Sequence, residues 1–407
     1  YGADGKDYID NCERFVFFSR AVMEAIRLLD LGVDVLHAND WQTGLAPAYL
    51  KTEYARVPRY QRIASLLTVH NIAFQGQFWH WDMLLTGLDW KYFNWRQMEF
   101  HGKLNLLKTG MVFADSISTV SPRYAQEIQS GTHGSGLEGV LQYRRDVLSG
   151  ILNGIDPDDW NPAADPHLAV RYGAETAAAG KAACKAALQQ EVGLPQAADV
   201  PLVASIGRLT DQKGLDLIAE VIQRWVQTAE VQWVILGTGQ PKYHRLLDGL
   251  AQRHPDKIAV RLEFSNPLAH RIEAGSDIFL MPSRFEPCGL NQLYSLKYGT
   301  VPVVRETGGL ADTITGYGGP QAASPPAVVP PAAGPPANGF MFQEYSPLAL
   351  SETLRRATDL FHQQPEVWRQ LIQTGMRQDW SWAHSAKQYV DLYVQTIARA
   401  GLEHAHA

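Results

Sequence analysis

Short runs of apolar residues alternate with longer amphipathic stretches along most of the chain. In most of these runs the apolar residues follow one another with few polar interruptions, and a segment with helical spacing comes next. Continuous apolar strands between helices are typical of a parallel sheet that helices cover on both faces. The pattern therefore predicts an α/β protein, with strands at 33–38, 63–69 and 116–120, and again at 201–206, 231–236, 258–264, 277–281 and 301–304.

The strands fall into two series, and the segment between the series has a different composition. Residues 153–162 are rich in turn formers and include Pro157 and Pro162. We place the crossover between two doubly wound domains there, so that the first domain spans 1–158 and the second 159–380. Two such domains that face each other enclose a cleft, where small ligands usually bind.

Residues typical of a helix start, or an amphipathic pattern, indicate where several helices lie. Ser121 and Pro122 combine an N-cap residue with a proline at the first helical position. Another helix is expected from about Gly44. Amphipathic patterns predict further helices at 10–30, 346–363, 365–376 and 382–400.

Residues 316–338 interrupt the alternation with a stretch of proline, alanine and glycine. Two interpretations are a polyproline ligand for a partner domain and an exposed loop. No basic residue flanks a Pro-x-x-Pro there, which favours the loop.

Composition excludes several classes of protein. The chain has 407 residues, 45% of them hydrophobic, and a formal net charge of −6. That length suggests two or three domains, and an acidic balance argues against binding to nucleic acid or an anionic membrane. No apolar run is long enough to span a membrane. The three scattered cysteines suggest neither a disulfide framework nor a zinc site, so we expect a reducing, cytoplasmic setting, or a plastid if the source is a plant.

The beginning of the chain is unusual. Tyr1 is not methionine, and residues 1–7 lack the charged start and apolar centre of a signal peptide. We expect Tyr1 to be a processed or truncated end.

The densest chemical signal follows the first strand of the second series. Gly207, Arg208, Lys213 and Gly214 lie on one loop directly after it. At the carboxyl end of a parallel strand this loop would face the ligand crevice, and an Arg and a Lys together suit a common anion. Solvated loop charges are the equally weighted alternative when the loop is considered by itself.

Two further strand ends carry glycines. Gly237 and Gly239 form a Gly-x-Gly turn that would let a ligand approach the backbone, although a tight strand-to-helix turn explains them equally well. Thr307 and Gly308 follow the last strand of the series and would add backbone amides.

A turn after residue 283 completes this set. Glu286, Cys288, Gly289 and Leu290 lie there, and a helix from about Cys288 would direct free N–H groups towards a phosphate. Glu286 would either cap that helix or reach a hydroxyl-rich ligand, and the helix start would acidify the Cys288 thiol. Four such loops together make a diphosphate site the favoured interpretation.

The first domain offers polar residues at two strand ends. Asp40 follows one strand, and His70 and Asn71 follow the next. A single strand-end histidine is more often structural than catalytic. Its position opposite a phosphate site shifts our interpretation towards function.

Nine segments of the chain match the pattern of one protein family, and the segment at 282–290 is close to diagnostic of it. The segments are 7–15, 37–42, 68–76, 150–156, 207–215, 282–290, 297–300, 307–312 and 379–382. Together they resemble the bacterial glycogen synthases and plant starch synthases. These are ADP-glucose-dependent retaining glucosyltransferases with two Rossmann-like domains, the GT-B arrangement. The resemblance implies that the last helix, in 381–407, returns to the first domain.

The resemblance also implies residue roles. Arg208 and Lys213 would hold the donor diphosphate, Glu286 would bind the glucose hydroxyls, and His70 would contact the glucose near its reacting carbon. Asp40, Asn71 and Asn153 would line the sugar and acceptor side. Phe264 would stack on the adenine, beside further donor contacts from Gly207, Gly237, Gly239, Cys288, Gly289, Leu290, Thr307 and Gly308.

The chemistry suits these residue types. Breaking a sugar–phosphate bond leaves positive charge on the sugar and negative charge on the diphosphate, which fixed cations and a carboxylate stabilise. No Asp-x-Asp pair in these motifs suggests a metal, so we expect none, and no cofactor beyond the donor substrate. The expected partners are ADP-glucose and an α-1,4-glucan acceptor.

The sequence departs from the family pattern in a few places. It has no Lys-x-Gly-Gly-Leu loop, which predicts an incomplete start to the first domain. Asn291 stands where threonine is common, and Tyr294 where wider relatives carry a second glutamate.

Two alternatives to the glycogen or starch synthase activity stay open. They are a UDP-glucose-dependent transferase of the sucrose synthase type and a nucleotide or glucan binder without turnover.

Overall fold

The computed structural model describes residues 2–3, 6–318 and 336–402. These residues form two compact units, one of 1–153 with 385–407 and the other of 154–384. The sequence-based boundaries at 158 and 380 differ from these by a few residues. The difference has a physical reason, because Ile155 donates its backbone N–H to Trp380 and so belongs with the second unit.

The first unit is built on a parallel four-stranded sheet of order β3-β4-β8-β9. All six positions of β4 are buried, including the polar Ser65 and Thr68, whose hydroxyls bond to Asp115 and Ser118. The strands expected at 33–38, 63–69 and 116–120 are present with ends shifted by one or two residues. The fourth was missed, and the observed bounds are β3 (Val35–Asn39), β4 (Ala64–Val69), β8 (Ser116–Thr119) and β9 (Leu148–Gly150).

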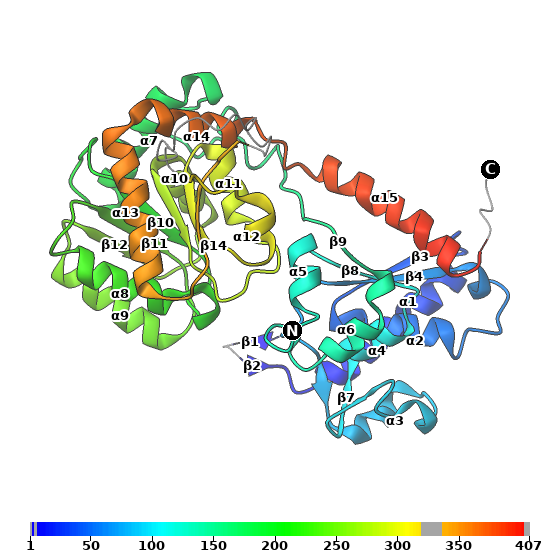
Figure 1. The fold of residues 1–407 in the computed structure, drawn as a ribbon. Helices are drawn as coiled ribbons and strands as arrows, with labels where there is room; N and C mark the ends of the chain where they lie inside the picture. The colour runs from blue at the N-terminus through cyan, green and yellow to red at the C-terminus, as the bar shows by residue number, and fades with distance from the viewer. Residues whose placement is uncertain (1, 4–5, 319–335, 403–407) are drawn as a thin grey trace, which may run out of the picture. The chain divides into compact units, whose positions relative to one another are not determined.

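Helices cover both faces of this sheet (Figure 1). One face packs on α1 (Asn11–Leu28), α2 (Leu45–Lys51) and α4 (Leu106–Phe113) through a large apolar core. On the other face, Leu392 of α15 (Trp382–Arg399) packs with Leu66 and Ile151. The described part of the chain also contains α5 (Pro122–Glu127) and α6 (Glu138–Tyr143). The predicted N-cap of α5 is confirmed, because the Ser121 hydroxyl accepts from the Tyr124 N–H.

A small antiparallel sheet projects from the first unit, and the sequence pattern did not predict it. Its order is β5-β7-β6. Its strands are two or three residues long, too short for an alternation signal to stand out. Their bounds are β5 (Gln77–Phe78), β6 (Glu99–Phe100) and β7 (Lys103–Asn105), and α3 (Met83–Thr86) lies between the first two.

The second unit contains a parallel sheet of order β12-β11-β10-β13-β14-β15. Five of its strands lie where the sequence predicts them, except that β12 ends at Arg261 instead of residue 264. The sixth follows the proline-rich segment and was missed. The bounds are β10 (Leu202–Ile206), β11 (Gln232–Leu236), β12 (Ile258–Arg261), β13 (Ile278–Met281), β14 (Val301–Arg305) and β15 (Phe340–Phe342).

Alternate residues of these strands enter two separate cores, so this sheet is covered on both faces. One core contains Trp233 and Leu280, and the other contains Val234 and Phe279. Helices on the first face are α8 (Leu215–Trp225), α9 (Pro241–Arg253) and α13 (Pro347–Gln363). Helices on the second are α7 (Ala177–Val192), α10 (Asn266–Gly275), α11 (Asn291–Tyr298) and α12 (Gly308–Thr313). Helix α14 (Pro365–Arg377) lies beside α11 and contributes Trp368 and Leu371 to the first core.

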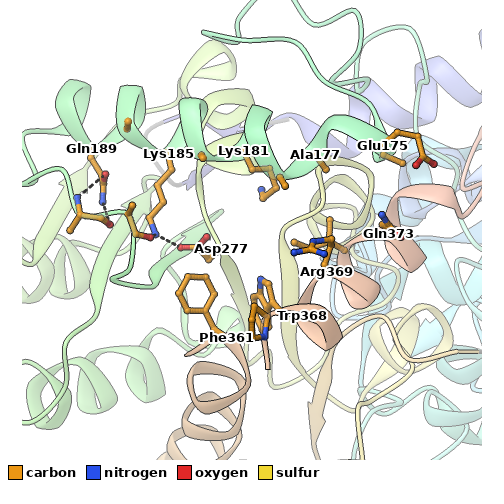
Figure 2. Close-up of a pocket in the computed structure, with 18 of the residues that line it drawn as sticks. Glu175, Ala177, Lys181, Lys185, Gln189, Asp277, Phe361, Trp368, Arg369 and Gln373 are labelled. Atoms are coloured by element: carbon orange, nitrogen blue, oxygen red, sulfur yellow. Dashed lines mark hydrogen bonds and ion pairs between the residues drawn. The ribbon is translucent and has the colours of Figure 1, made fainter. Parts of the chain in front are cut away.

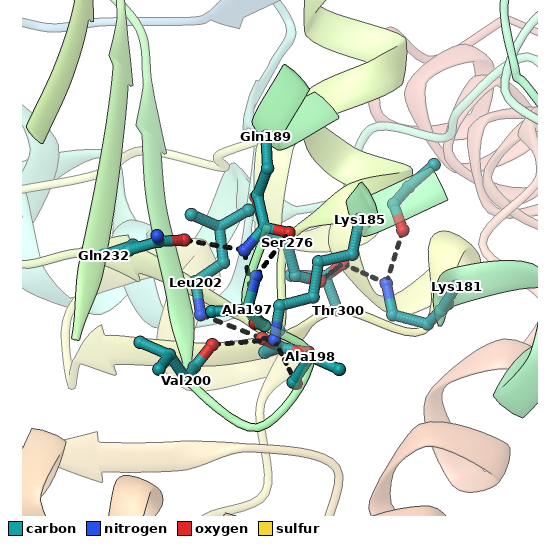
Figure 3. A network of polar contacts seen from close by, with 12 residues as sticks. Lys181, Lys185, Gln189, Ala197, Ala198, Val200, Leu202, Gln232, Ser276 and Thr300 are labelled. Carbon is teal, nitrogen blue, oxygen red and sulfur yellow. Dashed lines mark hydrogen bonds and ion pairs between the residues drawn. The ribbon is translucent and has the colours of Figure 1, made fainter. Parts of the chain in front are cut away.

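Two buried lysines of α7 hold that helix against the amino ends of the strands. Lys185 Nζ donates to the carbonyls of Ala198 and Val200 and lies 2.8 Å from Asp277 Oδ2 (Figure 3). Lys181 Nζ donates to Thr300 Oγ1 and to the Ala274 carbonyl. These lysines therefore satisfy backbone oxygens at the edge of the sheet opposite the predicted ligand loops.

A hollow of about 420 Å³ opens beside the same helix (Figure 2). Phe361 and Trp368 form its apolar wall opposite α7, and Lys185 and Asp277 lie between α7 and Phe361. Because it lies at the amino ends of the strands, this hollow is separate from the site that the sequence predicts.

The expected loop at 316–338 is described only at its ends. Gly316 and Gly339 form a parallel bridge there, and residues 319–335 lie outside the described part. None of the described helices is both long and apolar enough to cross a membrane.

Candidate active site

The strand order of the second unit identifies where its ligand crevice lies. From β10 the chain first adds β11 and β12 on one side, and then β13 and β14 on the other. Loops that leave β10 and β13 at their carboxyl ends therefore turn in opposite directions and leave a crevice between them. A small crevice is present there, lined by residues 205–209, Lys213 and Ser283.

The loop after β10 is fastened to its neighbours through the backbone. The Gly207 N–H donates to the Leu236 carbonyl, and the Arg284 N–H donates to the Gln212 carbonyl. The helix that follows the β13 loop is also joined to β10, since Asn291 Nδ2 at its start donates to the Ile206 carbonyl at 2.7 Å. The two loops that the sequence identified separately thus form one connected surface.

Two glycines in these loops have different reasons for being glycine. A Cβ on Gly237, whose φ is +157°, would lie 1.9 Å from the Gly207 carbonyl oxygen, so this position has no room for a side chain. Gly207 has a φ of +151°, but nothing lies within 4 Å of its Cβ position. Gly207 therefore borders open space that a ligand can occupy.

The two predicted cations differ in their surroundings. Lys213 Nζ lies 2.6 Å from Glu286 Oε2, and Ser283 Oγ donates to the same oxygen at 2.9 Å. Arg208 is exposed, and no ion pair joins it to any described residue. The structure thus places a paired cation, an unpaired cation and a buried carboxylate at the carboxyl ends of β10 and β13.

The turn at Glu286 differs in one respect from the sequence-based prediction. The next helix, α11, begins at Asn291 and not at Cys288, and Leu290 is its N-cap. Pro287 and Gly289, with a φ of +72° at Gly289, carry the chain through a separate turn first. Glu286 therefore caps no helix, and the expected acidification of Cys288 by a helix start has no structural basis. Cys288 is instead buried, with its carbonyl against Gly309.

The start of α12 holds the Glu286 turn from the other side. The Gly309 N–H donates to the Glu286 carbonyl at 3.0 Å, and Thr307 is the N-cap of this helix. Gly308 has a φ of +45°, and a Cβ there would lie 1.9 Å from the Glu286 carbonyl oxygen. The Thr307–Gly308 segment therefore fixes the backbone that carries Glu286.

We expect Gly308→Ala to damage both stability and activity. Alanine at this positive φ costs about 1–2 kcal/mol, and its methyl group displaces the Glu286 carbonyl. The midpoint of thermal unfolding should fall, and kcat/KM should fall about tenfold or more because the carboxylate moves. Gly139→Ala is the matched control, because nothing lies within 4 Å of a Cβ at Gly139. Wild-type kcat/KM in Gly308→Ala would contradict this role.

Phe264 lies in the loop between β12 and α10. Its side chain is 88% exposed, so the ring is open to a ligand. Gly239 lies in the loop that follows β11, where it forms a parallel bridge with Leu209 of the neighbouring loop. Leu290 is partly exposed beside the Glu286 turn.

In the first unit, Asp40 and His70 are in direct contact. The His70 N–H donates to Asp40 Oδ1 at 2.7 Å, and His70 Nε2 lies 3.0 Å from Asn39 Oδ1. Burial raises the pKa of Asp40, and the N–H groups of His70 and Asn71 partly offset that rise. Asp40 also has a φ of +55°. Such a conformation is unusual outside glycine and is concentrated at functional sites.

A hydrogen-bonded chain behind this pair went unrecognised in the sequence. His37 Nδ1 lies 2.9 Å from the Tyr393 hydroxyl of α15, and His37 Nε2 lies 2.6 Å from Thr68 Oγ1. Burial lowers the pKa of His37 to about 4, so the ring is neutral at physiological pH. This series of hydrogen bonds connects α15 to β3 and β4, the two strands that lead to Asp40 and His70. The histidine at 37 was visible in the sequence, but its partner lies far along the chain.

Asn153 lies just after β9, at the end of the first unit. Its side-chain oxygen is buried and has no hydrogen-bond partner among the described residues. A buried, unsatisfied oxygen of this kind requires an explanation, and a ligand hydroxyl is one.

An aromatic stack behind α11 was also missed. Trp160 lies between His270 and Tyr294, with ring centroids 3.9 Å and 3.6 Å away and nearly parallel planes. Asp165 Oδ2 lies 2.8 Å from His270 Nδ1 and accepts from the Tyr298 hydroxyl. All of these groups are partly or fully buried. Tyr294, at the position where wider relatives have glutamate, is therefore part of the support of α11.

Comparisons with known proteins agree with this organisation. Residues 1–143 match the family described as starch synthase catalytic domain, and residues 190–360 match glycosyl transferases group 1. A glycogen synthase of Rhodopirellula baltica is 48% identical over 98% of this chain and 77% of its own length. One from Anaeromyxobacter dehalogenans is 47% identical over 98% of this chain and 80% of its own length.

Solved structures extend the comparison to the fold. The catalytic domain of starch synthase IV from Arabidopsis thaliana, bound to ADP and acarbose, superposes with a TM-score of 0.87 at 33% identity. The match covers 97% of this chain and 79% of that one. A sucrose-phosphate synthase from Thermosynechococcus elongatus has a TM-score of 0.59 at 16% identity, covering 98% of this chain and 81% of its own, and shares only the fold.

Proposed function

We propose, since this chain belongs to the glycogen and starch synthase family of GT-B glycosyltransferases, that it transfers glucose from ADP-glucose to the non-reducing end of an α-1,4-glucan. The observation that supports this most directly is the group formed by Arg208, Lys213 and Glu286 at the topological switch point of the second unit. Cations and a buried carboxylate on adjacent loops suit a ligand that is a diphosphate at one end and a sugar at the other.

In this proposal the bond between the anomeric carbon of glucose and the phosphate oxygen breaks, and its electron pair leaves with ADP. Arg208 and Lys213 neutralise the negative charge that develops on the diphosphate. Glu286 binds the glucose hydroxyls and stabilises the positive charge on the ring. An acceptor hydroxyl forms the new bond on the same face, and its proton passes to the leaving phosphate oxygen, so that configuration is retained.

The remaining donor contacts are proposed from position. Gly207 borders open space, and Gly237 and Gly239 keep the adjoining loop close to it. Phe264 presents an exposed ring to the adenine. Thr307 and Gly308 fix the Glu286 turn, and Cys288, Gly289 and Leu290 follow Glu286 within it.

We propose that the first unit supplies the groups that act on the sugar and the acceptor. Asp40 holds the backbone of His70, Asn39 contacts its ring at Nε2, and Asn71 follows it directly. Asn153 offers an unsatisfied oxygen to a hydroxyl. Carboxylate, amide and imidazole groups are suited to a neutral, hydroxyl-rich ligand.

We also propose that no metal ion assists the departure of ADP. Arg208 and Lys213 already provide two positive charges at the place where a metal would act. Activity that is unchanged by a chelator supports this proposal, and loss of activity that Mg²⁺ restores contradicts it. The setting proposed is the cytoplasm, which fits three buried cysteines that form no disulfide.

A comparison of the two possible donors, ADP-glucose and UDP-glucose, tests the proposed function. Labelled ADP-glucose and UDP-glucose are supplied in turn with glycogen, and both nucleotide release and label in the glucan are measured. We expect faster transfer from ADP-glucose, with one ADP released per glucose added. Faster transfer from UDP-glucose would favour the sucrose synthase type of activity. Nucleotide binding without growth of the glucan would favour a binding protein.

A further inference from the structure

A tyrosine behind the two ligand loops contacts the segments that carry Lys213 and Glu286. Tyr345 follows β15 and is half-buried. Its hydroxyl donates to Asp216 Oδ1 at 2.6 Å, and the Arg284 guanidinium lies over its ring, 4.3 Å from the centroid. The described residues that line the crevice between β10 and β13 include Lys213 but not Tyr345. An effect of Tyr345 on a ligand there passes through other residues.

Asp216 brings the loop after β10 into this set of contacts. It lies in the first turn of α8, shortly after Lys213 in the chain. Asp216 Oδ2 lies 2.7 Å from Arg284 Nη2, so one carboxylate oxygen meets Arg284 and the other meets Tyr345. A carboxylate with donors on both oxygens has a fixed orientation. The start of α8, and with it the loop that carries Lys213, is therefore held against the loop after β13.

Arg284 and Arg305 bring in the loop after β13. Arg284 precedes Glu286 on that loop and stacks on the Tyr345 ring. Arg305, at the end of β14, donates from Nη1 to the Arg284 carbonyl at 2.7 Å, and its guanidinium lies 5.6 Å from the Tyr345 ring centroid. Arg305 Nε also donates to the Gln343 carbonyl at 3.1 Å, in the segment that leads to Tyr345. The backbone before Glu286 is thus tied to the segment after β15.

The ring of Tyr345 is where these contacts meet. A guanidinium over an aromatic face is attracted to the negative charge density of that face. The ion pair of Asp216 and Arg284 is partly exposed, and such a pair contributes little when it stands alone. Here the ring holds Arg284 and the hydroxyl orients Asp216. Loss of Tyr345 therefore loosens both partners together.

We infer that Tyr345 is a positioning residue, which keeps Lys213 and Glu286 at the spacing that the donor requires. Lys213 Nζ lies 2.6 Å from Glu286 Oε2. A diphosphate that binds the same ammonium weakens this ion pair, so the pair cannot by itself keep the two loops in register. A ligand in the crevice does not compete for the contacts of Tyr345, because those contacts lie behind the loops. The inference rests on the proposed roles of Lys213 and Glu286.

Tyr345→Leu tests this role, because leucine keeps apolar volume but removes both the ring face and the hydroxyl. We expect kcat to fall about tenfold, since a small displacement of a charge-stabilising group costs up to about 10²-fold in rate. KM for glycogen should stay within about twofold, because the proposed acceptor residues belong to the first unit. Circular dichroism at the assay temperature checks that the variant is folded.

Two conservative variants refine the comparison. Tyr345→Phe keeps the ring against Arg284 and loses the hydrogen bond to Asp216, so kcat should fall only about threefold. Tyr54→Phe is the matched control. The Tyr54 hydroxyl donates to Glu24 Oε1 at 2.7 Å in the first unit, so the control loses the same kind of hydrogen bond away from the ligand loops. We expect the kcat of Tyr54→Phe to equal that of wild type.

A double-variant cycle distinguishes positioning from a general structural role. If Tyr345 acts through Lys213, adding Tyr345→Leu to Lys213→Gln should cost less than about threefold in kcat. Calorimetric titration with ADP should show the same coupling, with about fivefold weaker binding in Tyr345→Leu and little further change in the Lys213→Gln background. Unchanged kcat in Tyr345→Leu, or equal losses in both backgrounds, would overturn the inference. Where wild type transfers no glucose, the proposed function fails, and the ADP titrations alone decide the role of Tyr345.

Discussion

Replacing Lys213 with glutamine is expected to lower kcat by about 10²–10³, the usual cost of losing one group that stabilises charge in a transition state. Lys213 lies on the loop after β10 with Arg208, and its ammonium is already fixed by Glu286 at 2.6 Å. Glutamine keeps much of the length and hydrogen bonding but removes the charge that offsets the departing diphosphate. Initial rates of ADP release with saturating glycogen measure the effect.

A control lysine separates this effect from a general change in charge. Lys387 is exposed on α15, outside every proposed contact, and Lys387→Gln should keep the wild-type rate. Lys213→Gln should also lower the free energy of unfolding by about 1 kcal/mol, because the buried Glu286 carboxylate loses a partner that is partly solvent-exposed. A rate within threefold of wild type would rule out the assigned role of Lys213.

Glu286→Gln is expected to have the second large effect, a fall in kcat/KM of about 10². The amide keeps the shape of the side chain, and its oxygen still accepts from Ser283, but its charge is lost. The variant therefore tests charge near the sugar and leaves the fold of the turn unchanged. Progress curves over a range of ADP-glucose concentrations give kcat/KM, and a circular dichroism melt checks the fold.

The double variant gives a sharper result. Lys213 and Glu286 are in contact, so their effects should not add. We expect Lys213→Gln/Glu286→Gln to be less impaired than the product of the two single losses predicts. Strict additivity would show that the two side chains act independently and would count against a shared site.

Much of the architecture was predictable because most of the long buried strands are largely apolar runs. The strands around Leu66 and Val234 could be recognised from such runs. The three-residue strands β9 and β15 were missed, since so few residues provide no periodicity to detect. The strand of residues 258–264 was predicted too long. Its last positions, Leu262, Glu263 and Phe264, lie in an exposed loop, and the two apolar residues among them resemble a continued strand in the sequence.

The candidate site was predictable to the level of loops, and its internal contacts were not. Arg208, Lys213 and Glu286 were found because strand ends of a parallel sheet converge on one edge. The contact between Lys213 and Glu286 spans 73 residues of sequence, so no local pattern reports it. The helix expected at Cys288 begins later because the Pro287–Gly289 turn comes first. The Trp160 stack and the link from His37 to Tyr393 also join distant segments.

The most direct test of the central claim is the affinity for ADP compared with AMP, measured by isothermal titration calorimetry on wild type and Arg208→Gln. If the loops after β10 and β13 hold the diphosphate, wild type should bind ADP at least about tenfold more tightly than AMP. Arg208→Gln should remove most of that difference and leave AMP binding nearly unchanged. Equal affinities of wild type and Arg208→Gln for ADP would contradict the account.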